Sequence, residues 1–192
     1  MKHFTLLLLM MLNAANACDD SNLFPDKLFP EVVISTNMGD IVVELDRNRA
    51  PITVNNFLKY VKARLYVNTI IHRVEENYVI QGGGYNADFK EINECGKIFN
   101  ESGNGLKNKK GSIAMARHDD PHSATSQFYF NLVDSDSLNP NPKRWGYAVF
   151  GEVVDGMEVL LAMAKVKTGY SDHLQSENVP LEFITIKSIT VN

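Results

Sequence analysis

The feature that most constrains the fold of this chain is a series of short segments in which apolar and polar residues alternate. Alternation with a period of two places one set of side chains on the core face of a β-strand. Turn-forming residues separate the segments, which is typical of an all-β domain. The seven or eight strands expected from this pattern are 31–37, 40–45, 69–74, 78–81, 112–116, 127–132, 147–154 and 181–191.

Only two segments show the helical spacing of apolar residues. The first begins at Pro51, which suits the first turn of a helix, and carries apolar residues at i, i+3, i+4 and i+7 from Val54. The second follows Asp155, which can cap a helix, and has the same spacing from Met157. Two helices are too few to cover a parallel sheet, but they can close the ends of a barrel.

The other segments are polar connections. Residues 18–30 are interrupted by proline and are expected to form an arm on the surface. Residues 85–111 and 166–179 have few apolar positions, so we predict loops there. The strands and helices together fit a mostly β domain, a closed β-barrel capped at its ends, over residues 31–192. Other β architectures share this pattern.

Two separated segments carry the most specific residues of the chain. Residues 69–85 read TIIHRVEENYVIQGGGY, and residues 123–131 read SATSQFYFN. In the second segment, alternation places Gln127 and Tyr129 on one face of a strand and the two phenylalanines on the other.

The two segments together resemble the signature of the cyclophilin family of peptidyl-prolyl cis/trans isomerases. In that family an FHRV segment, a QGG segment and an SQFF segment follow one another in this order, and the resemblance extends from about Val32 to Val191. It implies an eight-stranded antiparallel barrel with two capping helices. It also implies rotation about X-Pro bonds of proline-containing polypeptides, with no metal or cofactor.

The chemistry implied by the resemblance needs a hydrogen-bond donor and an apolar pocket. Rotation about an X-Pro bond disrupts the conjugation of the imide, against a barrier of about 18–20 kcal/mol. Arg73 matches the catalytic arginine of the family, and its guanidinium stays protonated at working pH. The alternative role for Arg73 is an ion pair with a nearby glutamate. His72 is one step away, so regular alternation would place it on the opposite face, in a structural role.

The resemblance also assigns the residues that contact the substrate. The expected pocket has an aromatic floor for the proline ring, two glutamines that orient the substrate, and a backbone segment that clasps the substrate chain. These substrate-binding residues are Tyr78, Val79, Gln81, Ala116, Arg117, Gln127, Tyr129, Leu138 and Tyr147. Tyrosines at 78 and 129, where the family has phenylalanine, add two hydroxyls that must find partners or water.

Two other classes of function were weighed against the enzyme. A catalytically weak module that binds proline-containing segments, as a chaperone or scaffold, is compatible with the changed pocket residues. A hydrolase or metalloenzyme is disfavoured, because the histidines show no HExxH or comparable spacing. The net charge of −4 gives no basic footprint, so we expect no nucleic-acid partner. Nothing in the sequence demands a dimer, and we expect a monomer.

The N-terminus has the pattern of a secretory signal. Residues 1–17 combine Lys2, a short apolar run and a small-x-small cleavage pattern that ends at Ala17. The run is too short to span a bilayer, so we expect no stable membrane insertion and a periplasmic or secreted protein. A lipoprotein modified on Cys18 is the second interpretation, although Ala15 and Asn16 fit that signal poorly.

The chain has only two cysteines, Cys18 and Cys95. Export permits a disulfide between them. We do not predict one, because Cys18 belongs to an arm that is expected to be flexible. Their distant positions offer no spacing for metal ligands.

Overall fold

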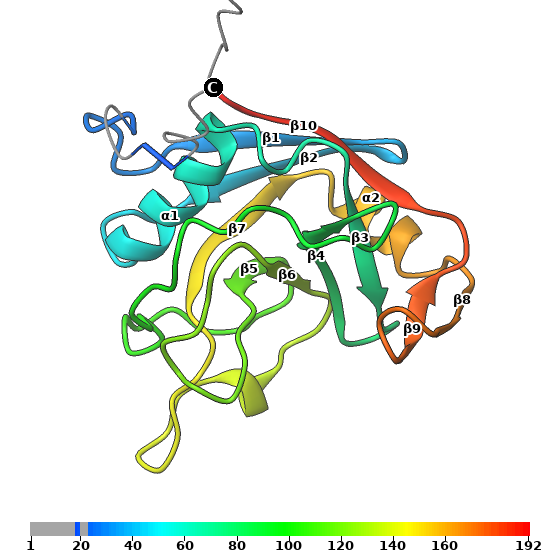
Figure 1. Cartoon of the computed structure of the whole chain (residues 1–192). Helices are drawn as coiled ribbons and strands as arrows, with labels where there is room; N and C mark the ends of the chain where they lie inside the picture. Colours follow the sequence, from blue (N-terminus) through cyan, green and yellow to red (C-terminus); the bar gives the residue numbers. More distant parts are fainter. Residues whose placement is uncertain (1–17, 20–22) are drawn as a thin grey trace, which may run out of the picture.

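The computed structural model describes residues 18–19 and 23–192, and the predicted signal segment 1–17 lies outside the described residues. Eight antiparallel strands close into a barrel in the order β1-β10-β3-β4-β6-β5-β7-β2 (Figure 1). This confirms the predicted eight-stranded barrel. The strands are β1 (Glu31–Thr36), β2 (Gly39–Leu45), β3 (Thr69–Val74), β4 (Val79–Asn86), β5 (Ser112–Met115), β6 (Phe128–Asn131), β7 (Val149–Asp155) and β10 (Ile184–Val191).

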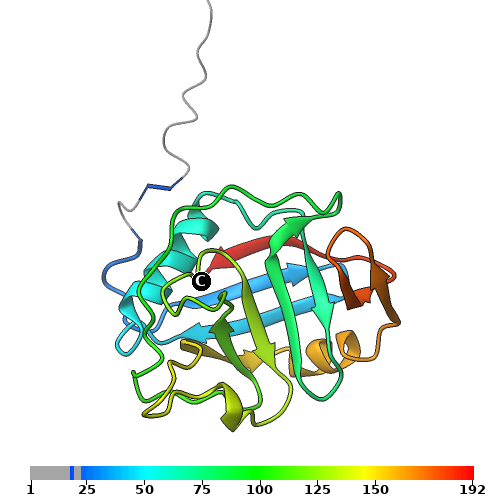
Figure 2. The same ribbon diagram turned by 60° about the horizontal axis from the view of Figure 1, so that its bottom comes forward.

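Two helices lie at opposite ends of the barrel (Figure 2). Helix α1 (Pro51–Lys62) begins at the predicted proline and buries the predicted apolar face. Its Phe57 ring is 5.2 to 5.5 Å from the rings of Tyr66, Phe128 and Phe150. This aromatic cluster fills one end of the barrel and joins the helix to the inner faces of β6 and β7.

Helix α2 (Met157–Met163) starts differently from the prediction. Its N-cap is Gly156, in a left-handed conformation with φ 83°, and no side chain caps the helix, so the expected capping role of Asp155 is wrong. A Cβ atom at Gly156 would lie 2.3 Å from the carbonyl oxygen of Asp40, so only glycine fits this approach to β2. The helix buries Leu160 and Met163 and leaves Leu161 40% exposed.

One of the two predicted loops contains regular structure. Residues 87–111 are mostly irregular, as expected, but β4 continues to Asn86, beyond the predicted end of that strand. Residues 166–179, predicted as loop, contribute to a hairpin of β8 (Thr168–Ser171) and β9 (Ser176–Pro180). The hairpin strands are only partly buried and mostly polar, so they lack the alternation that identified the others. Strand β9 packs beside β3, which brings its side chains to the edge of the site.

The N-terminal arm is fixed to the barrel by two sets of contacts. Cys18 and Cys95 form a disulfide, with Cα atoms 5.4 Å apart, which the sequence allowed but did not predict. The guanidinium of Arg47 donates hydrogen bonds to the backbone carbonyls of Leu23, Phe24 and Lys27. A buried arginine thus holds residues 23–27, and the composition of the arm gave no sign of this contact.

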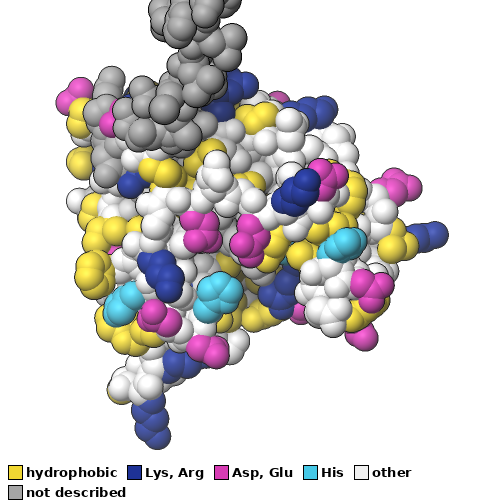
Figure 3. All heavy atoms as spheres, in the orientation of Figure 1, with side chains coloured by type: hydrophobic (Ala, Val, Ile, Leu, Met, Phe, Trp, Pro, Cys, Tyr) yellow, Lys and Arg dark blue, Asp and Glu magenta, His cyan; other side chains and the backbone are white. Residues whose placement is uncertain are grey.

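The surface carries interspersed charges. On the face shown in Figure 3, acidic and basic side chains alternate, and hydrophobic side chains also reach the surface. No helix among the described residues is long and apolar enough to cross a membrane.

Candidate active site

A β-bulge in β3 determines which side chains face the site. Ile71 pairs with Gly82 and Arg73 with Gln81, so His72 is an extra residue in the ladder. Ile71 belongs to the barrel core, whereas His72 and Arg73 both line the groove on the outer face. The prediction that His72 points to the opposite face from Arg73 is therefore wrong, since alternation holds only in a regular strand.

Arg73 sits at the centre of a chain of polar side chains. Its Nε donates to Oε1 of Glu75 at 3.0 Å, and Nη2 donates to the same oxygen. Nη1 donates to Oε1 of Gln81 at 3.1 Å, and Nε2 of Gln81 donates to Oε1 of Gln127 at 2.9 Å. The ion pair with a glutamate, considered above as an alternative role, exists beside the predicted site contacts.

The carboxylate of Glu75 is itself anchored. Its Oε1 accepts a hydrogen bond from Nδ2 of Asn178 on β9 at 3.0 Å. The small hairpin therefore reaches the guanidinium of Arg73 through one intermediate side chain. This contact fixes the carboxylate that accepts from Arg73.

A small cavity of about 110 Å³ lies beside the guanidinium. It is lined by nine of the ten predicted residues, which come from six separate segments of the chain. They are Arg73, Tyr78, Val79, Gln81, Ala116, Arg117, Tyr129, Leu138 and Tyr147. Leu138 ends a short 3-10 helix, Asp136–Leu138. The tenth predicted residue, Gln127, lines a larger groove of about 270 Å³ that shares Arg73, Gln81, Ala116 and Arg117 with the cavity.

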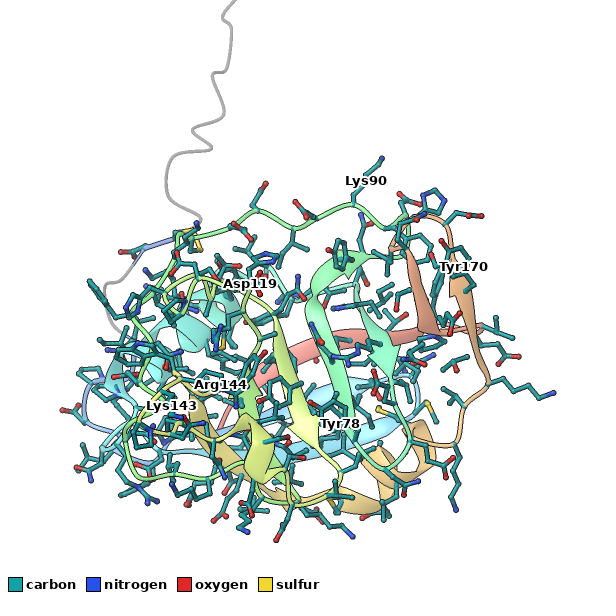
Figure 4. All side chains as sticks on the ribbon, turned by 90° about the horizontal axis from the view of Figure 1, so that it is seen from below. Tyr78, Lys90, Asp119, Lys143, Arg144 and Tyr170 are labelled. Atoms are coloured by element: carbon teal, nitrogen blue, oxygen red, sulfur yellow. A yellow bond between two sulfur atoms is a disulfide. The ribbon has the colours of Figure 1, made fainter. Side chains whose placement is uncertain are left out.

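The floor of the cavity is an apolar cluster separate from the barrel core. Val79, Tyr129 and Leu138 are buried there with Ala114 and Val149. Because these side chains point to the outside of the barrel, their apolar character is not needed to fill its interior. Figure 4 looks onto this face, where Tyr78 and Arg144 approach the site from segments far apart in the sequence.

The hydroxyl of Tyr129 finds its partner outside the cavity, whereas the ring of Tyr78 lies near Arg73. The Tyr129 hydroxyl donates to Oδ1 of Asn108 at 2.7 Å, and burial raises the pKa of this tyrosine well above its usual value. Asn108 does not line the cavity, so the ring of Tyr129 can form the floor while its polar end is satisfied elsewhere. Burial also raises the pKa of Tyr78, whose ring lies 5.8 Å from the Arg73 guanidinium.

Arg117 forms one wall of the cavity. Its guanidinium lies 4.6 Å from the ring centre of Tyr147. It donates to the carbonyl oxygens of His118 at 2.7 Å and Trp145 at 3.0 Å. Arg117 therefore stabilises the wall as well as lining it, and it is not simply solvated.

The His72 imidazole is neutral in this environment. Burial lowers its pKa to about 4, and the positive charge of Arg73 acts in the same direction. A neutral His72 adds no second positive charge beside Arg73. Among the described residues, no group of three His, Cys, Asp or Glu side chains could hold a metal ion.

Residues 31–191 match the family model described as cyclophilin type peptidyl-prolyl cis-trans isomerase/CLD. The chain belongs to the cyclophilin family. It is 47% identical over 164 residues to peptidyl-prolyl cis-trans isomerase B of Escherichia coli, covering 84% of this chain and 99% of that protein. It is 45% identical to the isomerase cyp18 of Streptomyces antibioticus, over 83% of this chain and 97% of that protein.

A solved cyclophilin has the same fold. The crystal structure of a cyclophilin type isomerase from Cryptosporidium parvum superposes with a TM-score of 0.70 at 27% identity, covering 85% of this chain and 98% of that one. The activity of this cyclophilin is peptidyl-prolyl cis/trans isomerisation, as in the bacterial relatives it matches.

Two residues of this cyclophilin site were missed by reasoning from the sequence. Glu75 is two positions from Arg73, so alternation alone could have placed both side chains on the same face. Asn178 could not have been found, because it lies 103 positions from Glu75 in a segment predicted as loop.

Proposed function

We propose that this cyclophilin isomerises X-Pro bonds in exported polypeptides and so assists their folding in the periplasm or outside the cell. Arg73 is the catalytic group, and the cavity beside it receives the proline ring. The observation that carries the proposal is the position of the Arg73 guanidinium at an apolar, aromatic-floored cavity of about 110 Å³. A crystal structure of the Cryptosporidium parvum relative was obtained in the presence of the dipeptide Ala-Pro, which supports proline-containing substrates.

The hydrogen bonds of Arg73 leave donors free for the substrate. A guanidinium has five N–H groups. Among the described residues, three of these N–H groups have an acceptor, one on Nε, one on Nη2 and one on Nη1, which leaves one on each terminal nitrogen. Both belong to terminal nitrogens, which are the atoms that can reach a substrate in the cavity.

The free donors act when the imide twists. As conjugation is lost, the lone pair localises on the prolyl nitrogen, and a donor placed there stabilises the twisted state more than the planar one. An acceleration of five decades would require about 7 kcal/mol of such differential stabilisation. Isomerisation transfers no proton, so the neutral His72 has no acid or base role.

The disulfide supports the exported location. Disulfides persist in oxidising compartments such as the periplasm and the extracellular space. A lipid on the sulfur of Cys18 would exclude the bond to Cys95, so the disulfide favours a soluble exported protein over a lipoprotein. Together with the predicted signal at residues 1–17, this favours cleavage near Ala17.

The catalytic part of the proposal is tested by exchange spectroscopy on an Ala-Pro peptide. Oxidised protein 18–192 is compared with Arg73→Ala and with Arg73→Lys, which keeps the charge but loses the forked geometry. We expect kcat/KM to fall about 100- to 1,000-fold in Arg73→Ala and nearly as far in Arg73→Lys. Unchanged catalysis in Arg73→Ala would overturn the assignment of Arg73.

A second outcome separates the enzyme from the binding module. If the unaltered protein binds the peptide without accelerating isomerisation, the chaperone or scaffold alternative replaces the proposal.

The location is tested in the native host by mass spectrometry of the periplasmic and extracellular fractions. The expected mature protein begins at Cys18 and contains no free thiol.

A further inference from the structure

We propose that three aromatic side chains beside the active site, the exposed Phe99 and Trp145 and the half-buried His122 between them, bind an apolar segment of the same client chain whose X-Pro bond is in the cavity. We call these three residues the aromatic ladder. The inference rests on the proposed function and extends it from the X-Pro bond to the flanking chain.

The aromatic ladder is a continuous surface built from three separate loops. The ring centres of Phe99 and His122 are 5.3 Å apart, and those of His122 and Trp145 are 5.2 Å apart, both in edge-to-face geometry. Phe99 is 70% exposed and Trp145 is 49% exposed. Single exposed apolar residues are ordinary, but contiguous ones from distant segments indicate an interaction surface.

Hydrogen bonds beneath the rings hold the three loops together. Nδ2 of Asn100 donates to the carbonyl oxygens of Pro121 at 3.1 Å and Gly146 at 3.0 Å. The backbone N–H of Asn100 donates to Nδ1 of His122 at 3.1 Å. Asn100 thus joins its own loop, which carries Phe99, to the loop of His122 and the loop of Trp145. A surface that is already ordered loses little conformational entropy when a chain binds to it.

The aromatic ladder is continuous with the substrate cavity through Arg117. This residue lines the cavity, stacks on Tyr147 and donates to the carbonyl oxygens of Trp145 and Gly146. A chain that leaves the cavity along this wall therefore meets the aromatic ladder. Figure 3 shows hydrophobic side chains gathered at the lower left of the face, where the loops after β4 and β6 lie in Figure 1.

The occupant that fits is an extended segment with leucine, valine or proline side chains. Edge-to-face rings leave apolar ring faces and edges exposed, which favours contact with aliphatic side chains and the flat proline ring. An unfolded client exposes such side chains, whereas a folded protein buries them. The aromatic ladder would thus raise affinity for unfolded chains without altering the reaction at the X-Pro bond.

The test compares three peptides with the same central Ala-Pro bond. The first has four residues; the second adds about ten residues rich in Leu and Val on each side, about 30 Å of extended chain. The third has the same length with Ser and Gly in the flanks. The proteins are the unaltered chain, Phe99→Ser and Trp145→Ser, with Tyr170→Ser as the control. Tyr170 is 57% exposed on β8 and lies across the molecule from Arg144 (Figure 4).

We expect either ladder substitution to raise KM for the apolar long peptide about three- to tenfold, with kcat unchanged. The four-residue and Ser/Gly peptides should show no change, and Tyr170→Ser should behave as the unaltered protein with all three. Equal KM values for the apolar long peptide in every protein would overturn the inference. So would an equal rise with the four-residue peptide, which would mean a damaged cavity.

Trp145 provides a second readout that needs no catalysis. It is the single tryptophan of the chain, so its fluorescence reports on the aromatic ladder directly. The apolar long peptide should shift the emission to the blue, with weaker binding in Phe99→Ser, even if the protein proved to be a binding module. A shift that depends on protein concentration without peptide would instead identify a second copy of the chain as the occupant, against the proposal.

Discussion

At the scale of single residues, the burial of His72 makes the stability of the folded protein depend on pH. The side chain is 7% exposed, and its Nδ1 has no hydrogen-bond partner among the described residues. Its pKa is about 4 in the folded protein and about 6.5 in an unfolded chain. Between these values the unfolded state binds a proton that the folded state does not, so stability falls as pH falls through this window.

The first prediction concerns this stability. Between pH 7 and pH 5 the unaltered protein should lose about 2 kcal/mol more unfolding free energy than His72→Gln, which cannot titrate. The loss should be complete below pH 4 and absent above pH 7. Urea unfolding of both proteins across this range measures the difference. Parallel stability curves would show that His72 is protonated as easily in the folded state as in the unfolded one.

The second prediction concerns the carboxylate that holds the catalytic arginine. Without Glu75, the hydrogen bond to Gln81 is the one that the guanidinium keeps among the described residues, so Glu75→Ala should lower kcat/KM for a four-residue peptide about three- to tenfold. Glu75→Gln keeps an oxygen that can accept from Arg73 and should retain most activity. Glu76→Ala, at the exposed neighbour, is the control. A rise in kcat/KM in Glu75→Ala would mean that the carboxylate competes with the substrate.

At the scale of elements, helix α1 is capped from a distance. Its N-cap residue Ala50 offers no side-chain acceptor. Glu101, from the loop between β4 and β5, accepts from the backbone N–H of Ile52 at 3.1 Å and of Thr53 at 2.8 Å. It also accepts from the Thr53 hydroxyl at 2.7 Å. One carboxylate therefore satisfies two backbone N–H groups of the first turn, and its negative charge interacts favourably with the positive end of the helix dipole.

The third prediction tests this remote cap. Glu101→Ala should lower the unfolding free energy by about 1–2 kcal/mol, in the range of lost N-caps. Glu101→Gln keeps the acceptor oxygen and loses the charge, so its loss should be smaller. Thermal and urea unfolding measure both, and four-residue peptide turnover serves to verify an intact site. An unchanged stability in Glu101→Ala would mean that water replaces the carboxylate at no cost.

The elements also show how far the sequence predicts this molecule. Local periodicity identified the barrel strands and α1, because burial on one face imposes a repeat on each segment. The hairpin of β8 and β9 was missed, since half-buried polar strands carry no such repeat. The residues around the small cavity were predicted from the resemblance of the motifs to the family signature. The predicted orientation of His72 was wrong, because a bulge interrupts the alternation of β3. The contacts made by Glu101 and Asn178 depend on distant segments, which no local pattern records.

At the scale of the whole molecule, one covalent bond closes most of the first half of the chain. Cys18 and Cys95 are 77 positions apart, and the bond joins the arm to the loop that carries Phe99 and Glu101. A cross-link over a loop of this length lowers the entropy of the unfolded chain by an amount equivalent to about 4.5 kcal/mol in the loop-closure model. The arm contacts of Arg47 act on the same segment in the folded state.

The last prediction is that this bond is a main source of stability and has no part in catalysis. Cys18→Ser, Cys95→Ser and the double variant should lose the same unfolding free energy, about 4.5 kcal/mol at most, because each breaks the same bond. Reductant should lower the unfolding free energy of the unaltered protein to that of the variants and should leave the unfolding free energy of the variants unchanged. The rate with a four-residue peptide should stay constant at 25 °C, since neither cysteine lines the cavity. Urea unfolding with and without reductant measures this difference. Equal unfolding curves for the unaltered protein would mean that the two sulfurs are not joined. The bond would then no longer support an exported location.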